Sequence, residues 1–313
     1  MGNLMNAYDL EHVSLGPLMF ASTFVLVGDH YQLPPLVQNA EARENGMGAS
    51  LFCRLSEAHP QAISTLQCQY RMCAGIMELS NALIYGNRLR CGSKEIANAK
   101  LEFSNEKPIT SWLKEFSCSM TMFELLEIFD KVDLLPGLEK REQKVVNNPT
   151  EAYIVKEITV ALRNRGIVED DIGIITPYNM QAKLIWQMVG TTVEIHTIDK
   201  YQEPEKPRML IICISSVSAQ GRDKDCILLS FVRSSETLRA CNSTLLGDWH
   251  RINVAITRAK KKLIMVGSCK TLSTVPLLKL LIDKVHEQSG IVNVSKTDIH
   301  YLGELKKCSL TSV

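Results

Sequence analysis

The chain has 313 residues, of which 45% are hydrophobic and 22% charged, so it can bury one large core or two modest ones, and wholesale disorder is excluded. Lys and Arg number 35 against 34 Asp and Glu, a balance that excludes a globally basic nucleic-acid binder and leaves only local contacts. The ten cysteines lack zinc-type spacing, and neither a signal peptide nor a bilayer-spanning apolar run is present, so we expect a soluble intracellular protein with reduced thiols and no metal site.

Short apolar runs alternate with amphipathic stretches along the chain. Short strands that alternate with helices predict an α/β fold with a mostly parallel sheet covered on both faces. Strands are expected at 23–29, 63–67, 171–178, 193–198, 226–232 and 261–267. Helices are expected at 75–85, 149–166 and 276–290, and the run 117–131, SCSMTMFELLEIFDK, also has a helical pattern. Near Leu66 to Tyr70 the pattern of one predicted sheet ends and a new helix begins, and we place a domain boundary there.

Polar residues that directly follow strands are the first candidates for a binding site, because ligands of open α/β sheets gather at the carboxyl ends of strands. Asp29 and Gln32 follow the strand expected at 23–29, within GDHYQLPP, where Gln32 could reach a phosphate or a water; an ordinary turn is an equal alternative. Arg71, in QYRM, lies at the predicted boundary, where a guanidinium can meet a phosphate across a cleft, although a lone Arg is more often a surface residue.

Two later motifs also carry candidate residues. Thr176 and Tyr178 end a strand in TPY and offer a hydroxyl and an aromatic face for a single-stranded nucleic acid, against a simple Pro turn as the alternative. Arg258 follows Thr257 in a polar turn within NVAITRAK. The lysine run 260–262 alone is interpreted as a solvated face.

The order and spacing of GDHYQLPP, QYRM, TPY, DKYQ, GRDKD and NVAITRAK resemble the second half of a superfamily 1 helicase. Stretches such as GIMELSNALIYGNRL and GDWHRINVAITRAKKKLIMVG place the likeness in the branch of the eukaryotic DNA replication ATP-dependent helicase/nucleases, as a truncated or alternatively spliced form. The resemblance covers Gly16 to about Gly290. It implies a remnant of a first RecA-like domain at 1–68, a nearly complete second RecA-like domain at 69–290, and a tail at 291–313.

The resemblance also implies roles for individual residues. In that family two RecA-like domains hold ATP and Mg²⁺ between them and move along single-stranded DNA. Carried over, Asp29 and Gln32 sense the γ-phosphate, while Arg71 and Arg258 act as arginine fingers. Gln32 and the two arginines are then the catalytic residues, and all four side chains contact nucleotide.

The coupling loop between nucleotide and DNA is implied at two separate segments. Asp199 and Gln202 are assigned to its nucleic-acid side, and Gly221 and Asp223 to its nucleotide side. Thr176, Tyr178 and Lys224 are expected to line the path of the strand and to contact backbone, without reading sequence.

Three departures from the family pattern change the functional prediction. The sequence contains no GxxxxGK[ST] phosphate loop and no DEA-type magnesium carboxylates before GPLMF, where YDLEHVSL stands instead. The nuclease domain is absent, and no cysteine is assigned to an iron–sulfur cluster. We therefore expect ATP and Mg²⁺ to serve only a complete enzyme, and the chain alone to be inactive.

The third departure is an 18-residue insert, 203–220, that splits the coupling loop and carries the apolar run MLIICISSV. An alternative splice acceptor or a faulty gene model would explain it, and a true extra strand is the rival interpretation.

The predicted function is thus the motor half of an ATP-dependent helicase with single-stranded DNA and replication or repair proteins as partners, in the nucleus or an organelle. A non-catalytic binding fragment and an RNA helicase of the nonsense-mediated-decay branch stay open as alternatives.

Overall fold

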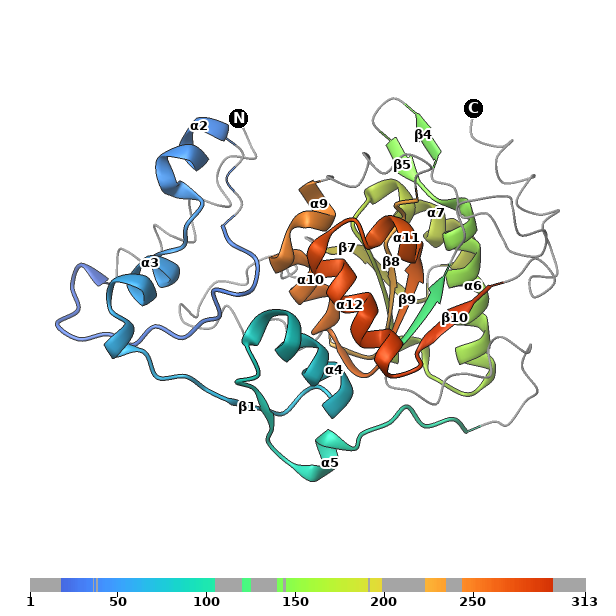
Figure 1. Cartoon of the computed structure of the whole chain (residues 1–313), viewed down its shortest axis with the longest axis horizontal. Coiled ribbons are helices and arrows are strands. Elements are labelled where there is room, and N and C mark those ends of the chain that lie inside the picture. Colours follow the sequence, from blue (N-terminus) through green and yellow to red (C-terminus); the bar gives the residue numbers. More distant parts are fainter. Residues whose placement is uncertain are drawn as a thin grey trace. The chain divides into compact units, whose positions relative to one another are not determined.

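The computed structural model of the chain describes residues 18–35, 37, 39–104, 120–124, 140–142, 145–190, 192–198, 223–234 and 244–294 (Figure 1). These residues fall into two compact units. The first ends at Leu66, and the second begins at Gln67. Each unit is described by itself below.

The first unit contains short helical segments connected by loops. These are α2 (Ala40–Ala42), η1 (Arg43–Met47), α3 (Leu51–Ala58) and η2 (Pro60–Ala62). α3 begins at Ser50, whose side chain accepts a hydrogen bond from the Cys53 N–H, as expected for a helix cap.

The strands predicted at 23–29 and 63–67 are not formed. Both segments are irregular, and Val25 and Val27 are 81% and 64% exposed. An apolar run becomes a parallel strand only when neighbouring strands supply its hydrogen bonds, and the described residues of the first unit include no strand. The prediction considered only the composition of each run, which says nothing about the presence of a partner.

The second unit is built on a six-stranded sheet in which every neighbouring pair is parallel, in the order β10-β3-β9-β8-β6-β7. The strands are β3 (Met120–Glu124), β6 (Ile172–Thr176), β7 (Glu194–Thr197), β8 (Lys224–Ser230), β9 (Ala259–Gly267) and β10 (Ile291–Asn293). Ile174 pairs with Leu228, and Leu228 with Ile264, so the centre of the sheet is continuous and apolar. This confirms the α/β class, and the arrangement is that of a RecA-like helicase domain.

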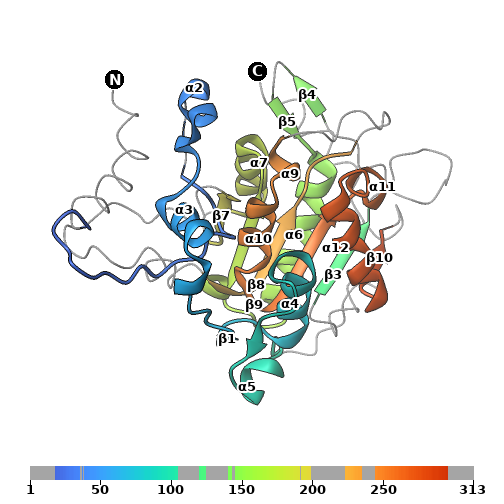
Figure 2. The same cartoon turned by 60° about the vertical axis from the view of Figure 1, so that its left-hand side comes forward.

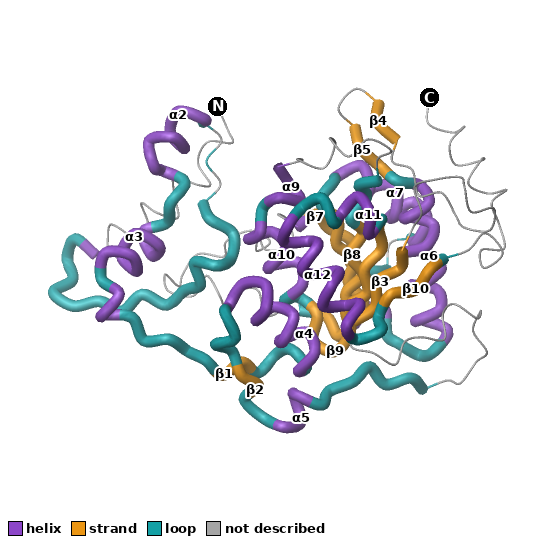
Figure 3. The backbone as a smooth tube through the Cα atoms, in the orientation of Figure 1, coloured by secondary structure: helices purple, strands orange, loops and turns teal. Residues whose placement is uncertain are grey.

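Helices cover both faces of this sheet (Figures 1 and 2). One face carries α6 (Pro149–Asn164) and α7 (Asn179–Val189), and the other carries α4 (Ala74–Ser80), α10 (Trp249–Ile256) and α12 (Pro276–Glu287). Shorter helical segments are η3 (Asn81–Tyr85), α5 (Lys94–Ala97), η5 (Glu169–Asp171), α9 (Thr244–Gly247) and α11 (Cys269–Leu272). The tube view separates these helices from the strands that they cover (Figure 3). None of the described helices is long and apolar enough to cross a bilayer.

Helix α6 shows why the sequence prediction succeeded in this unit. Asn148 accepts the Glu151 N–H at the N-terminus, Pro149 occupies the first helical position, and Gly166 beyond the C-terminus has a φ of 89°. Ile154, Ile158 and other apolar side chains at helical spacing are buried against the sheet.

The helical pattern read at 117–131 was wrong for the residues that the structure describes there. Residues 120–124 form β3, hydrogen-bonded between β9 and β10, with Met120 and Met122 fully buried. Burial between two strands outweighs the local helical preference of Met and Glu.

Two further expectations about this part of the sheet were incomplete. Lys262, in the run interpreted as a solvated face, is buried and donates to Thr121 Oγ1 at 2.8 Å, because residues of β9 alternate between two covered faces. Residues 291–293, placed in a tail, form β10.

Two small sheets complete the described part. β1 (Cys68–Gln69) pairs in parallel with β2 (Arg90–Cys91), and β4 (Lys140–Glu142) pairs antiparallel with β5 (Val145–Asn147). The β1–β2 pair encloses most of the segment that holds QYRM and α4: β1 includes Gln69, the first residue of QYRM, and β2 follows α4 and η3.

Candidate functional site

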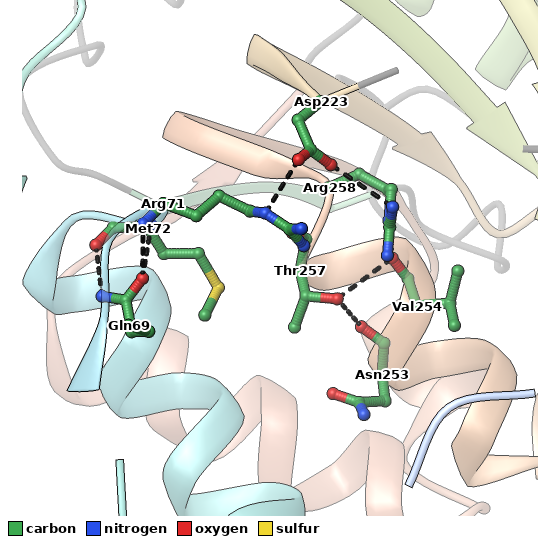
Figure 4. A network of polar contacts seen from close by, with 8 residues as sticks. All are labelled: Gln69, Arg71, Met72, Asp223, Asn253, Val254, Thr257 and Arg258. Carbon is green, nitrogen blue, oxygen red and sulfur yellow. Dashed lines mark hydrogen bonds and ion pairs between the residues drawn. The ribbon is translucent and has the colours of Figure 1, made fainter. Parts of the chain in front are cut away.

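Three charged side chains meet at the amino-terminal edge of the large sheet (Figure 4). Asp223 directly precedes β8 and Arg258 directly precedes β9; since Lys224 pairs with Ala259, the two side chains start from neighbouring points. Arg71 arrives from the turn before α4. Its Nε lies 2.8 Å from Asp223 Oδ2, and Arg258 Nη1 lies 3.3 Å from Asp223 Oδ1.

The turn that carries Arg71 is organised by the side chain of Gln69. Gln69 Oε1 accepts the N–H groups of Arg71 and Met72, both at 2.8 Å, and Gln69 Nε2 donates to the Met72 carbonyl at 2.7 Å. The Cys73 N–H then donates to the Lys260 carbonyl at 2.8 Å, which ties this turn to β9. Sequence reasoning selected Arg71 but overlooked Gln69, although it is the first letter of the same QYRM motif.

Arg258 is held by the preceding helix, α10, as well as by Asp223. Its Nε donates to the carbonyl of Val254 at 3.3 Å, one turn earlier in α10. Arg71 Nη1 donates to the carbonyl of Thr257, the residue between α10 and Arg258, at 3.4 Å. Both arginines therefore contact the end of α10 as well as the shared carboxylate.

The burial of the three side chains is unequal. Arg71 is 31% exposed, whereas Asp223 is 5% and Arg258 is 1% exposed. Burial raises the pKa of the Asp223 carboxyl above its ordinary value, and the positive charges of Arg71, Arg258 and Lys260 oppose this rise. Of the two guanidinium groups, only that of Arg71 is therefore accessible to an anion from solvent.

Thr176 and Tyr178 lie at the opposite, carboxyl-terminal edge of the sheet. Thr176 ends β6 and is fully buried, and no hydrogen-bond partner of its Oγ1 is present among the described residues. Tyr178 precedes α7 and is partly exposed, and its hydroxyl accepts from Arg233 Nη1 at 3.5 Å. The structure brings these two predicted residues together and adds Arg233, which sequence reasoning missed.

Lys224 does not join Thr176 and Tyr178. It begins β8, whereas they follow the end of the parallel strand β6, so the length of the sheet separates them. Lys224 Nζ instead lies 2.9 Å from Glu194 Oε2 and donates to the Asp170 carbonyl at 2.8 Å. Its place beside the other two on the path of the nucleic acid was carried over from the family resemblance and stays a prediction.

Asp29 and Gln32 form a local turn in the first unit. Asp29 Oδ1 accepts the Tyr31 N–H at 3.0 Å, and Gln32 Nε2 donates to Asp29 Oδ2 at 3.4 Å. The structure thus brings the two predicted residues into contact with each other. Asp199, Gln202, Gly221 and the insert 203–220 lie outside the described residues.

The described residues include no group of three or more His, Cys, Asp or Glu side chains placed to hold a metal ion. Asp223, the carboxylate nearest the two arginines, is paired with both of them. The two guanidinium groups of the site therefore suit an anion.

Comparison with known proteins gives a match to a family model described as AAA domain over residues 47–270. A protein of Arabidopsis thaliana named DNA replication ATP-dependent helicase/nuclease JHS1 is 62% identical over 289 residues, covering 92% of this chain and 20% of that protein. DNA replication ATP-dependent helicase/nucleases of Schizosaccharomyces pombe and Homo sapiens are 39% and 38% identical over 92% and 95% of this chain. The resemblance predicted from the motifs is confirmed.

The share of the relatives that is matched is small. The chain spans 20% of the length of the fission yeast protein and 28% of the human one.

Proposed function

The chain belongs to the AAA domain family, and from that premise we propose that it forms the second motor domain of an ATP-dependent helicase that moves along single-stranded DNA. The observation that carries this proposal is the convergence of two guanidinium groups, from residues 187 positions apart, on one carboxylate at an edge of the sheet. Two cations held around a single anion are suited to a phosphate group, which guanidinium binds bidentately. The names of the helicase/nuclease relatives support the same assignment.

In this proposal Arg71 and Arg258 neutralise the negative charge that develops on the γ-phosphate. Arginine fingers of this kind act through electrostatics and position alone, since phosphoryl transfer requires little covalent chemistry from the protein. The partly exposed Arg71 makes the first contact, and Arg258 follows when Asp223 releases it. Asp29 and Gln32 are proposed to sense the γ-phosphate of ATP in the complete motor.

The remaining requirements for hydrolysis come from outside these residues. The sequence has no GxxxxGK[ST] loop to hold the triphosphate and no DEA-type magnesium carboxylates before GPLMF. When bound, Mg²⁺ neutralises phosphate charge. We therefore propose that the chain alone does not hydrolyse ATP and that it contributes its arginines to a complete motor.

The nucleic-acid contact is proposed at the carboxyl-terminal edge, at Thr176 and Tyr178. A tyrosine ring beside a hydroxyl suits one base and one backbone group of a single strand. Asp199, Gln202, Gly221 and Asp223 are proposed to couple this edge to the nucleotide. Lys224, at the other end of β8, is proposed to act only through its contacts with Glu194 and Asp170. For a helicase of DNA replication we propose a nuclear location, with an organelle as the alternative.

Binding of single-stranded DNA by the chain should be weak, independent of sequence and strongly reduced by salt, since backbone contacts dominate such sites. Replacing Tyr178 with Ala should cost about 1 to 3 kcal/mol of binding free energy, the value for one lost base stack. Fluorescence anisotropy with labelled oligothymidylate and its RNA counterpart measures both effects. Trp186→Ala, on the exposed side of α7, is the matched aromatic control.

Three results would count against the nucleic-acid assignment. Equal affinity of the wild-type chain and Tyr178→Ala would make Tyr178 a packing residue. A marked preference for RNA would favour the RNA-helicase branch. Tight binding of DNA that salt does not weaken would favour the alternative of a non-catalytic fragment, which binds nucleic acid or a partner protein through another surface.

A further inference from the structure

Four buried polar side chains form a network beneath Tyr178 that the proposed chemistry does not use. Asn148, Glu151, Gln181 and Ser230 are all fully buried. They come from the start of α6, the first turn of α7 and the end of β8, so the network joins three elements at the carboxyl-terminal edge of the sheet. Buried polar groups on this scale are costly unless they are hydrogen-bonded, and here each one is.

The network fixes the first turn of α7 from one side. Gln181 Oε1 accepts the Asn148 N–H at 2.8 Å, and Gln181 Nε2 donates to the Asn148 carbonyl at 3.1 Å and to Ser230 Oγ at 3.1 Å. Gln181 lies three residues after Tyr178, which precedes α7. The backbone position of Tyr178 is therefore tied to α6 and β8 through one amide side chain.

The same network fixes the turn after β8. Ser230 Oγ donates to Glu151 Oε2 at 2.6 Å, and the Val232 N–H donates to the same oxygen at 2.8 Å. Asn148 Nδ2 donates to the Val232 carbonyl at 3.2 Å. Val232 has a φ of 71°, a left-handed conformation that a β-branched residue adopts only when its surroundings enforce it.

The strained turn leads directly to the hydroxyl of Tyr178. Arg233 follows Val232, is buried, and donates from Nη1 to Tyr178 Oη at 3.5 Å. Glu151 thus reaches Tyr178 by two routes, through Ser230 and Gln181 to its backbone and through Val232 and Arg233 to its hydroxyl. Strained backbone conformations of this kind are concentrated at functional sites, where they hold side chains in the geometry that binding requires.

We propose that Glu151 is a positioning residue for nucleic-acid binding: its buried carboxyl group holds the Val232 turn and the Gln181 link so that Tyr178 presents its ring to a base of a single strand. This inference rests on the proposed nucleic-acid function of Tyr178. It adds to that function a buried carboxyl group, 27 residues earlier in the chain than the tyrosine. Loss of this carboxyl group is expected to reduce the affinity without removing any group that contacts the ligand.

The test uses the whole chain and labelled oligothymidylate. Glu151→Leu removes both acceptors and is expected to weaken binding about tenfold, as for the loss of one stacked base. Glu151→Gln keeps one oxygen for the Ser230 hydroxyl and the Val232 N–H, and should restore most of the affinity. Thr159→Val, which removes a buried hydroxyl bond to the Val155 carbonyl two turns along α6, is the control and should bind as the wild type does.

A double-mutant cycle separates positioning from general destabilisation. If Glu151 acts through Tyr178, Glu151→Leu combined with Tyr178→Ala should bind no more weakly than Tyr178→Ala alone. Additive losses would overturn the inference, as would a Glu151→Leu protein with lowered thermal stability and unchanged affinity. If Glu151→Leu fails to fold, Ser230→Ala replaces it in the same cycle and is judged by the same outcomes.

Hydrogen exchange of residues 178–184 without nucleic acid distinguishes this inference from the proposed function. Faster exchange there in Glu151→Leu, with wild-type exchange in Thr159→Val, supports positioning of Tyr178. Unchanged exchange overturns it. If exchange changes but the wild-type chain does not bind the oligonucleotide, the proposed nucleic-acid function fails and the positioning of Tyr178 stands.

Discussion

Replacing Arg258 with Ala is expected to lower DNA-stimulated ATP turnover by about a thousandfold in a protein that also carries the phosphate loop, since a finger is typically worth that much in phosphoryl transfer. A hybrid in which this chain, with residues 203–220 deleted so that Gln202 joins Gly221, replaces the matching segment of the Arabidopsis relative provides such a protein; with the insert retained, DNA-stimulated turnover is expected to be lost. Initial rates at saturating ATP and oligothymidylate measure the effect. Arg71→Ala should cause a loss of similar size, because both guanidiniums are proposed to meet the same phosphate.

Arg251 supplies the control for this experiment. It lies on α10, seven residues before Arg258, and its Nε is 3.8 Å from Asp248 Oδ2. Arg251→Ala should keep most of the turnover. If the ATP turnover of the Arg258→Ala hybrid falls by less than about tenfold, Arg258 is a structural ion-pair partner and not an arginine finger.

Replacing Asp223 with Ala should lower the free energy of unfolding by roughly 3 to 5 kcal/mol, because it leaves the Arg258 guanidinium buried without its carboxylate. This loss of stability is larger than what the intact ion pairs contribute to the free energy of unfolding. Their net contribution is small because burial raises the pKa of Asp223 and so disfavours its charged form. Urea unfolding of the chain at neutral pH measures the difference. The exposed Arg71 can turn to water, so the cost falls mainly on Arg258.

Asp225→Ala is the matched control, two residues later in the chain and within β8. Asp225 Oδ2 lies 2.7 Å from Lys261 Nζ, and both side chains are partly exposed, so the loss should be at most about 1 kcal/mol. Equal losses in the two variants would mean that the Asp223 carboxylate does not hold Arg258 in its buried position.

The second unit could be predicted well from sequence because its signals are local. The expected strands at 171–178, 193–198, 226–232 and 261–267 and the helices at 149–166 and 276–290 all correspond to elements of the structure. An apolar run flanked by helix caps or glycines is enough to predict a strand or a helix when the neighbouring strands lie in the same unit. The same pattern at 23–29 failed, because no neighbouring strand is present among the described residues of the first unit.

The candidate site was predicted in part. The motifs identified Arg71, Asp223 and Arg258, which the structure brings together, and Thr176 with Tyr178, which it places at the other edge. The rule that ligands gather at carboxyl ends of strands did not predict an arginine pair at the amino ends of β8 and β9. Gln69 and Glu151 were missed because their roles depend on contacts with backbone groups, and spacing in the sequence does not reveal such contacts.

ATP hydrolysis with and without single-stranded DNA, measured for the chain alone and for the hybrid, tests the central claim most directly. The account predicts no turnover by the chain alone, because nothing in its sequence cradles the phosphates, and DNA-stimulated turnover by the hybrid that depends on Arg258. Turnover by the isolated chain that Arg258→Ala abolishes, or hybrid turnover that Arg258→Ala leaves intact, would contradict it.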